Sequence, residues 1–501
     1  MISVSNKQHW LIEQSTNQPN KQAVIISERT ITYQDLYNES SAAADFLQSK
    51  GIRKNDHVGI LVTHNYNFYL VVNALWFIGA VPVPLNTRLL PEELETQTKQ
   101  ADIKFLLIDE SLSKQFSQLI FPNKIYISKN SKFVLHNIRS EILNSSTCLP
   151  AGMFSIINSA LIMFTSGSSG KSKAVVHTFE SLFGSVKAID SFADLSTEDI
   201  WLASLPFFHI GGFMILVRSL IVGSSIAFPD SLEHKNVVYT IQKFLPTHIS
   251  IVPTTLLRFL NENTHPNANL KYVFLGGGPS EKELILNAVN QGWPIVKVYG
   301  STETCSMITA LLPNEIKEKP ESAGKVLDEN KIKIKNINKN NSDDLAGTGE
   351  VGDIIVSAKS LFKEYYNDHV SNSKSIQNGW FNSGDFGSID KDGYLFVESR
   401  REDLIITGGE NVSAREVETA IKSLKSVKDV FVFALQDKIW GQIVCAAIVS
   451  SGLDEDEIKN FLKEKIAGYK IPKRFFFLDE IPRNELGKIT RAALLKLLNL
   501  Y

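Results

Sequence analysis

Short apolar runs alternate with helical patterns from residue 22 to about residue 400. Examples are KFLLID (104 to 109), THISIV (247 to 252) and KYVFLGG (271 to 277). Strands buried on both faces have this composition, and their alternation with helices is typical of an α/β domain with a largely parallel sheet. We therefore predict α/β architecture for this part of the chain.

A different pattern begins at KIKIKNI (331 to 337), which alternates strictly. In a strand, this alternation puts Ile332 and Ile334 on one face and lysines on the other, so we interpret the lysines as a solvated strand face. The polar, turn-forming stretch from Asn338 to Gly349 then predicts a loop between strands.

The pattern changes again after Arg400. A helix is predicted from Ala414 to Leu424, because its apolar residues recur at helical spacing. Two strands, KDVFVFAL and IVCAAIVS, follow it, and further helices and RFFFLD come after them. These elements predict a compact α+β unit of roughly 100 residues.

The length of 501 residues exceeds what one hydrophobic core usually supports, so at least two domains are expected. Lys and Arg number 52 against 54 Asp and Glu, which gives a net charge of -2. This balance offers no electrostatic reason to bind nucleic acid or anionic lipid. We expect small molecules as partners, and we leave open whether the chain forms a homo-oligomer.

Cys148, Cys305 and Cys445 are widely spaced and odd in number, which fits neither a disulfide framework nor a zinc site. A reducing cytoplasm is therefore expected. The first 14 residues have no continuous apolar core that would serve as a secretion signal. The apolar stretch from Tyr69 to Leu85 contains Gly and Pro, so it predicts a buried helix and an extended segment rather than a membrane span.

One loop carries the strongest chemical signal. The segment MFTSGSSGKSKAVVH (163 to 177) follows the apolar strand ALIMF and is dense in glycine, hydroxyl and lysine side chains. Glycines let backbone N–H groups approach anionic oxygens, while hydroxyls and lysines bind phosphate. The alternative is a flexible surface turn. A Walker A loop is disfavoured, since that motif needs glycine where this chain has Thr165, five positions before Gly170.

The loop TSGSSGKSKA resembles the phosphate loop of the adenylate-forming superfamily of acyl-CoA synthetases, usually TSGTTGxPKG. Ser172 stands where proline is usual and Ala174 where glycine is usual, while Lys173 occupies the lysine position. Other motifs similar to those of the family follow in the expected order: LPFFHIGG (205 to 212), LGGGPS (275 to 280), YGSTETCS (299 to 306), FNSGDFG (381 to 387), SRREDLIITGGENVSAREVE (399 to 418) and PRNELGKITR (482 to 491).

The resemblance implies an enzyme that uses ATP and Mg²⁺ to form an acyl adenylate, and then transfers the acyl group to coenzyme A. It implies that Glu303 binds the metal and that Asp385 binds the ribose. It also implies that Arg400 contacts ribose or phosphate and that Lys488 stabilises the charge that develops during adenylation. The implied catalytic residues are Lys488, Glu303, His209 and Thr165. The implied nucleotide-binding residues are Ser166, Gly167, Ser168, Ser169, Gly170, Lys173, Gly276, Gly277, Gly278, Pro279, Tyr299, Gly300 and Thr302.

The family organisation implies a large N-terminal adenylation domain of several subdomains (1–399), a hinge (400–403) and a small mobile α+β domain (404–501). Glu402 falls on the hinge position, and Gly408 and Gly409 resemble the glycines that pass the pantetheine arm of CoA. Ser399 and Ala414 depart from the usual glycine and proline.

The acid is indicated by the apolar helical run after His209, which contains Arg218 nine residues further on. A cation on a buried helix needs an anionic partner, either an internal Asp or Glu or a substrate. In the branch of the family that activates 2-succinylbenzoate for menaquinone synthesis, a basic residue here helps bind the aromatic carboxylate. The resemblance thus favours this dicarboxylate, with His209, Arg218, Gly277 and Ser301 at the acid site.

Three alternatives stay open. The first is a ligase for a benzoate or a medium-chain fatty acid, with Arg218 paired internally. The second is an adenylation enzyme that loads a carrier protein, although no carrier segment follows in this sequence. The third is a non-catalytic nucleotide-binding relative.

Overall fold

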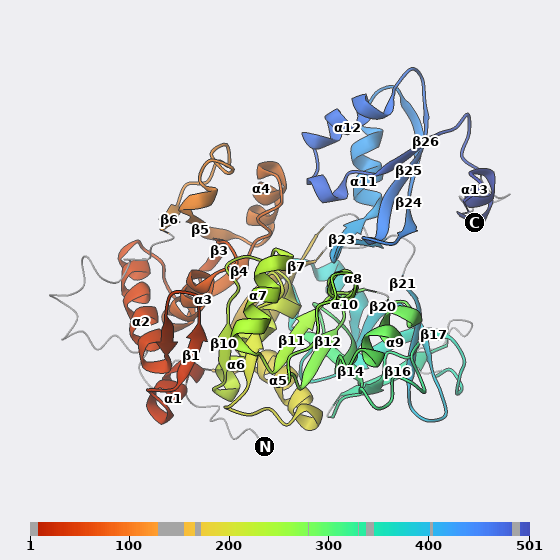
Figure 1. Cartoon of the computed structure of the whole chain (residues 1–501). Helices are drawn as coiled ribbons and strands as arrows, with labels where there is room; N and C mark the ends of the chain where they lie inside the picture. The colour runs from red at the N-terminus through yellow and green to blue at the C-terminus, as the bar shows by residue number, and fades with distance from the viewer. Residues whose placement is uncertain are drawn as a thin grey trace. The chain divides into compact units, whose positions relative to one another are not determined.

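The computed structural model (Figure 1) describes residues 9–128, 155–165, 172–278, 280–328, 330–336, 345–400, 404–482 and 491–500, with the backbone alone at 398–400, 404 and 491–493. It divides into two compact units, and each is described by itself. Unit 1 comprises residues 1–87, 95–165 and 174–398, and unit 2 comprises 88–94, 166–173 and 399–501.

Within the described ranges, the largest sheet of unit 1 has nine strands in the order β15-β14-β13-β12-β11-β9-β10-β1-β2. The six central strands run parallel to one another; they are β13, β12, β11, β9, β10 and β1. The outer strands β2, β14 and β15 are antiparallel to their neighbours. The strands are β1 (Gln22–Ile25), β2 (Thr30–Thr32), β9 (Ile200–Leu202), β10 (Ser225–Ala227), β11 (His248–Ile251), β12 (Tyr272–Leu275), β13 (Ile295–Ser301), β14 (Ser306–Leu311) and β15 (Lys325–Val326).

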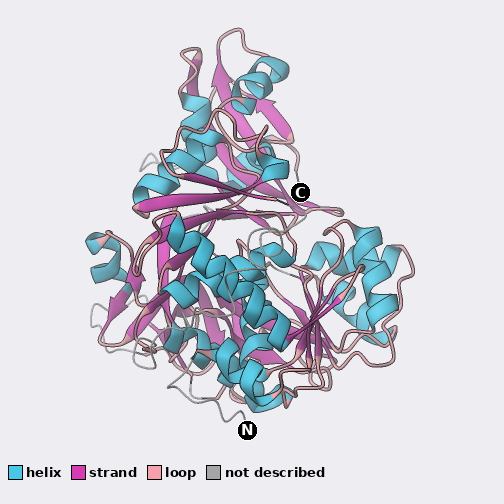
Figure 2. Cartoon of the chain, turned by 90° about the vertical axis from the view of Figure 1, so that its left-hand side faces the viewer, coloured by secondary structure: helices cyan, strands magenta, loops and turns pink. Residues whose placement is uncertain are grey.

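Helices cover both faces of this sheet, because successive strand residues belong to different cores. In β12, Phe274 packs in a core shared with α1, α2, α3, α5 and α6, whereas Val273 and Leu275 pack in a core shared with α7, α8 and α9. Figure 2 draws strands in magenta and helices in cyan, and helices lie beside the strands. The prediction of buried, largely parallel strands is therefore confirmed.

The described ranges between residues 10 and 375 contain ten α-helices. They are α1 (Trp10–Asn17), α2 (Tyr33–Ser49), α3 (Tyr66–Ile78), α4 (Pro91–Gln100), α5 (Phe179–Ala193), α6 (Ile210–Val222), α7 (His234–Phe244), α8 (Pro253–Asn261), α9 (Lys282–Asn290) and α10 (His369–Ser375). The predicted helix and extended segment between Tyr69 and Leu85 are α3 and β4. Among the helices in the described ranges, none combines the length and apolar character that crossing a bilayer requires.

Unit 1 contains three further sheets. A parallel sheet has the order β4-β3-β5-β6, a small sheet has the order β18-β8-β7, and a third has the order β16-β17-β20-β19 with β21 beside β20. Their strands are β3 (His57–Leu61), β4 (Val81–Pro84), β5 (Ile103–Asp109), β6 (Lys124–Ile127), β7 (Ser159–Thr165), β8 (Lys173–Thr178), β16 (Lys331–Lys335), β17 (Gly352–Ser357), β18 (Glu364–Tyr365), β19 (Ile376–Gln377), β20 (Trp380–Ile389) and β21 (Leu395–Arg400).

Unit 2 is an α+β unit built on a sheet with the order β23-β22-β25-β24, and β26 pairs with β25. Val417 and Ile421 of α11 are buried against this sheet, which confirms the helix that periodicity predicted there. The elements are β22 (Leu404–Thr407), β23 (Glu410–Ser413), α11 (Ala414–Lys422), β24 (Val427–Asp437), β25 (Gly441–Ser450), α12 (Glu455–Lys463), β26 (Arg474–Phe477) and α13 (Arg491–Leu497). The predicted boundaries of the large domain (1–399), the hinge (400–403) and the small domain (404–501) remain a prediction.

Candidate adenylation site

A tight turn links β13 to β14 and carries the segment YGSTETCS. The Cys305 N–H donates to the Thr302 carbonyl at 3.0 Å, and Cys305 and Ser306 have φ values of 55° and 84°. These left-handed conformations are unfavourable for residues other than glycine and need support from their surroundings. A Cβ at Gly300 would lie 1.8 Å from the backbone carbonyl oxygen of Ser306, so the turn requires glycine there.

The side chain of Glu303 is half-buried in this turn. Its Oε1 accepts a hydrogen bond from the Tyr365 hydroxyl at 2.9 Å, and its carbonyl accepts one from the Phe362 N–H at 2.8 Å. Burial, and then the Glu303 carboxylate, raise the pKa of Tyr365, so the phenol remains a donor at neutral pH.

His177 supports the same turn from β8. It is fully buried, and burial lowers its pKa to about 4, so the ring is neutral near pH 7. Its Nε2 lies 2.8 Å from the Thr302 carbonyl, which only accepts, and therefore Nε2 carries the proton. The sequence did not reveal His177 or Tyr365, because each lies more than 60 positions from its partner and no local pattern links them.

The structure brings Tyr299 and Asp385 together from two different sheets of unit 1. The Tyr299 hydroxyl of β13 donates to Asp385 Oδ2 of β20 at 2.7 Å, and Asp385 is 2% exposed. The Asp385 N–H also donates to Ser383 Oγ at 3.1 Å. Two candidates that are 86 positions apart thus form one polar pair.

The candidate glycines Gly276, Gly277 and Gly278 directly follow β12. Since β12 and β13 are parallel neighbours, with Leu275 paired to Lys297, these glycines and the residues at the end of β13 leave the same edge of the sheet. Ligands of parallel α/β sheets bind outside the carboxyl ends of the strands. Pro279 lies outside the described residues.

The predicted phosphate loop is described only at its ends. Thr165 is the last residue of β7 in unit 1, and its side chain is half-buried. Lys173, which groups with unit 2, is the half-buried first residue of β8. Ser166, Gly167, Ser168, Ser169 and Gly170 lie outside the described residues.

Arg218 projects from α6 into the interior of unit 1 and has no exposed surface. Its Nη2 donates to Ser306 Oγ at 3.1 Å, and its guanidinium lies 5.3 Å from the centroid of the Trp201 ring. Nε and Nη1 have no hydrogen-bond partner within the described part of the chain. Burial lowers the pKa of Arg218 to about 10, which still leaves the side chain charged near pH 7.

The described residues provide no carboxylate that neutralises this charge. None of the ion pairs among them involves Arg218, and the buried Asp199 instead pairs with Lys271 at 2.7 Å. His209, the other candidate for the acid site, occupies the N-cap of the same helix and is half-buried.

In unit 2, Gly408 and Gly409 form the turn between β22 and β23. Gly408 has φ 59°, and a Cβ there would lie 2.8 Å from the Trp440 ring. Lys473 covers the same ring, with Nζ 3.5 Å from its centroid. The sequence predicted that the pantetheine arm of CoA passes close to these glycines, but it did not reveal that Trp440 lies beside Gly408. Arg400 is described by its backbone alone, and Glu402 and Lys488 lie outside the described residues.

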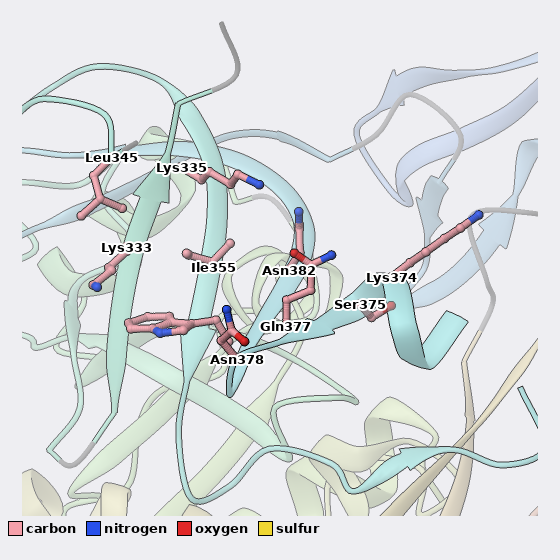
Figure 3. Close-up of a pocket in the computed structure, with 10 residues that line it drawn as sticks. Lys333, Lys335, Leu345, Ile355, Lys374, Ser375, Gln377, Asn378 and Asn382 are labelled. Carbon is pink, nitrogen blue, oxygen red and sulfur yellow. The ribbon is translucent and has the colours of Figure 1, made fainter. Parts of the chain in front are cut away.

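A basic pocket of about 390 Å³ lies elsewhere in unit 1. Figure 3 shows its lining, which includes Lys333, Lys335 and Lys374, and Lys333 Nζ lies 4.5 Å from the centroid of the Trp380 ring. Lys333 and Lys335 are the lysines that alternation placed on one strand face. No predicted site residue lines this pocket, so we place the candidate site at the edge beyond β12 and β13 instead.

Two family models match most of the chain. The AMP-binding enzyme family model matches residues 11–366, and the AMP-binding enzyme C-terminal domain model matches residues 416–488. The 2-succinylbenzoate–CoA ligase of Bacillus subtilis (strain 168) is 32% identical over 489 residues, which is 97% of each chain. The ligase of the same name from Bacillus licheniformis is 33% identical over 96% of this chain and 98% of its own.

Solved structures give the same result. A double mutant of o-succinylbenzoate CoA synthetase from Bacillus subtilis, bound to the product analogue OSB-NCoA, has a TM-score of 0.88 at 32% identity, covering 97% of this chain and 98% of that one. The same enzyme in complex with ATP and magnesium ion has a TM-score of 0.71 at 32% identity, covering 97% and 98%. The predicted adenylate-forming fold is thus confirmed, and the chain belongs to the AMP-binding enzyme family.

Proposed function

We propose that this chain is an AMP-forming acid–CoA ligase that activates 2-succinylbenzoate, with an acyl adenylate as intermediate. The observation that carries the choice of acid is Arg218, a buried cation without a carboxylate partner among the described residues. Relatives of that name, at least 32% identical over nearly the full length, support both the reaction and the acid. The product would serve menaquinone synthesis.

In the first half-reaction, the substrate carboxylate attacks the α-phosphate of ATP and pyrophosphate leaves. The loop from Thr165 to Lys173 would hold the phosphates, and Lys488 would stabilise the charge that develops during the attack. Gly276 to Pro279 and Tyr299 to Gly300 would line the adenine site. Asp385, oriented by the Tyr299 hydroxyl at 2.7 Å, would accept hydrogen bonds from the ribose, and Arg400 would contact ribose or phosphate.

Glu303 fits the metal that the family uses with ATP. Magnesium is bound through one or two protein carboxylates together with substrate phosphates, rather than by a protein cage. The described residues contain no group of three or more His, Cys, Asp and Glu side chains that would form such a cage, and the half-buried Glu303 lies in the turn between β13 and β14. When bound, Mg²⁺ would reduce the negative charge of the phosphates, and Thr302 beside Glu303 would contact them through its hydroxyl.

In the acid site, the buried guanidinium of Arg218 would bind the aromatic carboxylate of 2-succinylbenzoate. Ser306 supplies a hydroxyl beside Nη2, so a carboxylate there would find both a charge and a second donor. His209, Gly277 and Ser301 would close the site around the rest of the acid. Nε and Nη1, which have no hydrogen-bond partner among the described residues, are the groups that such a ligand would satisfy.

In the second half-reaction, the CoA thiol attacks the adenylate carbonyl and AMP leaves. Gly408 and Gly409 would let the pantetheine arm pass close to the backbone. The family resemblance assigns this step to a rotation of the small domain about residues 400–403, with Glu402 at the hinge.

A Glu402→Pro variant tests the hinge. Proline fixes φ and removes the backbone N–H, so it restricts the rotation that thioester formation needs. We expect thioester formation from supplied adenylate to fall more than pyrophosphate release, with Glu402→Ala as a control that removes the charge and keeps the backbone free. Equal loss of both half-reactions in the proline variant would count against a hinge.

The proposed activity is tested by acid-dependent pyrophosphate release across a panel of carboxylic acids. We expect 2-succinylbenzoate to give the highest kcat/KM, and CoA to accept the acyl group. Preference for a benzoate or a medium-chain fatty acid would overturn the choice of acid alone. Transfer to a carrier protein but not to CoA would favour a carrier-loading enzyme, and no release with any acid would indicate a non-catalytic nucleotide-binding protein.

We further propose a cytoplasmic location. Among the described residues, Cys305 and Cys445 are buried free thiols, as in proteins of reducing compartments. The net charge of -2 supports small-molecule partners and no nucleic acid or membrane partner.

A further inference from the structure

The hydrogen bond between Tyr365 and Glu303 leaves the two carboxylate oxygens of Glu303 in different situations. Oε1 accepts the Tyr365 hydroxyl at 2.9 Å. Within the described part of the chain, Oε2 takes part in no hydrogen bond or ion pair. A carboxylate held through one oxygen keeps a fixed orientation, while its second oxygen remains available to an incoming ligand.

Tyr365 is itself held rigidly. Tyr365 is 3% exposed and packs in an apolar cluster with Val175, Phe362 and Phe381. The Asn372 side chain clamps the Tyr365 backbone from α10, because Oδ1 accepts the Tyr365 N–H at 2.7 Å and Nδ2 donates to the Tyr365 carbonyl at 2.9 Å. The hydroxyl is therefore placed by packing and by backbone contacts on both sides.

The backbone around Glu303 is fixed by the same region. The Phe362 N–H donates to the Glu303 carbonyl at 2.8 Å, and His177 donates to the preceding carbonyl, that of Thr302, at 2.8 Å. Both donors belong to neighbouring strands or their ends, since β18 pairs antiparallel with β8. With the backbone held in this way, the side-chain rotamer of Glu303 is the freedom that remains, and the Tyr365 hydroxyl restricts it.

We propose that Tyr365 is a positioning residue for the adenylation step: its hydroxyl holds Oε1 of Glu303 so that Oε2 faces the metal that accompanies ATP. This inference rests on the proposed function only in taking Glu303 as the metal ligand. Partners that orient metal ligands typically contribute about 10- to 100-fold in metal affinity or activity. Tyr365 itself would touch neither ATP nor the acid.

A Tyr365→Phe variant removes the hydroxyl and keeps the ring, so the apolar cluster stays filled. The readout is the gain in ATP affinity that the metal provides, which is the ratio of the dissociation constant of ATP in EDTA to that of MgATP. Calorimetry without acid measures this ratio in the absence of turnover. We expect the ratio to fall by about tenfold or more, and the affinity for metal-free ATP and the thermal midpoint to stay near wild type.

The matched control is Tyr366→Phe. Tyr366 is the next residue, and its hydroxyl also donates to a carboxylate, Asp102 Oδ2, at 2.9 Å. This variant loses the same kind of hydrogen bond away from the Glu303 turn, so its ratio should equal that of wild type. In a Glu303→Gln background, Tyr365→Phe should cause no further fall, because the orienting contact then has no carboxylate to act on.

An unchanged ratio in Tyr365→Phe, or an equal fall in both tyrosine variants, would overturn the positioning role. A further fall in the Glu303→Gln background would overturn it as well. Failure of the proposed function appears separately, as wild-type protein without acid-dependent pyrophosphate release. The binding ratio uses no acid and can be read in either case.

Discussion

Replacing Lys488 with alanine should slow acyl-adenylate formation by about 100- to 1000-fold, and leave thioester formation from supplied adenylate close to wild type. The reason is electrostatic. By the family resemblance, this lysine stabilises the charge that develops at the reacting carboxylate and α-phosphate. That charge arises in the first half-reaction only. Single-turnover pyrophosphate release and CoA-dependent consumption of the adenylate measure the two steps separately.

Lys496→Ala is the matched control, because Lys496 is an exposed lysine of α13 a short distance along the chain. It should leave both half-reactions unchanged. A Lys488→Ala enzyme that releases pyrophosphate at the wild-type rate would contradict the assignment. Equal loss of both steps would indicate a defect in folding or binding instead.

Replacing Arg218 with leucine should raise the KM for 2-succinylbenzoate and leave the KM for ATP close to wild type. Losing a buried charge partner costs about 2–5 kcal/mol, which corresponds to roughly 30-fold or more in KM. Stability should not fall, since Arg218 is a buried cation with no carboxylate partner among the described residues, and replacing such a costly charge by an apolar side chain of similar volume is neutral or stabilising. Steady-state kinetics and a thermal midpoint check both parts.

The sharpest control for Arg218 is a change in the acid. A 4-oxo-4-phenylbutanoate molecule lacks the aromatic carboxylate of 2-succinylbenzoate and is otherwise alike. Wild-type enzyme should discriminate strongly between the two acids, and Arg218→Leu should lose most of that discrimination. If the variant discriminates as well as wild type, Arg218 does not bind the aromatic carboxylate, and the choice of acid loses its main support.

The sequence alone determined most of the local structure. The runs at 104 to 109, 247 to 252 and 271 to 277 became β5, β11 and β12, and the periodic helix after Ser413 became α11. These predictions succeed because burial on one or both faces imposes a period on a single segment. The family was also predictable, because six motifs in a fixed order are a property of the chain and need no coordinates.

Only the tertiary structure decided which side chains meet. Tyr299 reaches Asp385, Tyr365 reaches Glu303 and His177 reaches Thr302 across 86, 62 and 125 positions, and each contact depends on strand order and register that no local pattern specifies. For Arg218, the sequence predicted a cation on an apolar helix and left its partner open between an internal acid and a substrate. The structure places it against Trp201 and Ser306 with two nitrogens unsatisfied among the described residues, because the burial of a charge is local while its neutralisation depends on distant segments.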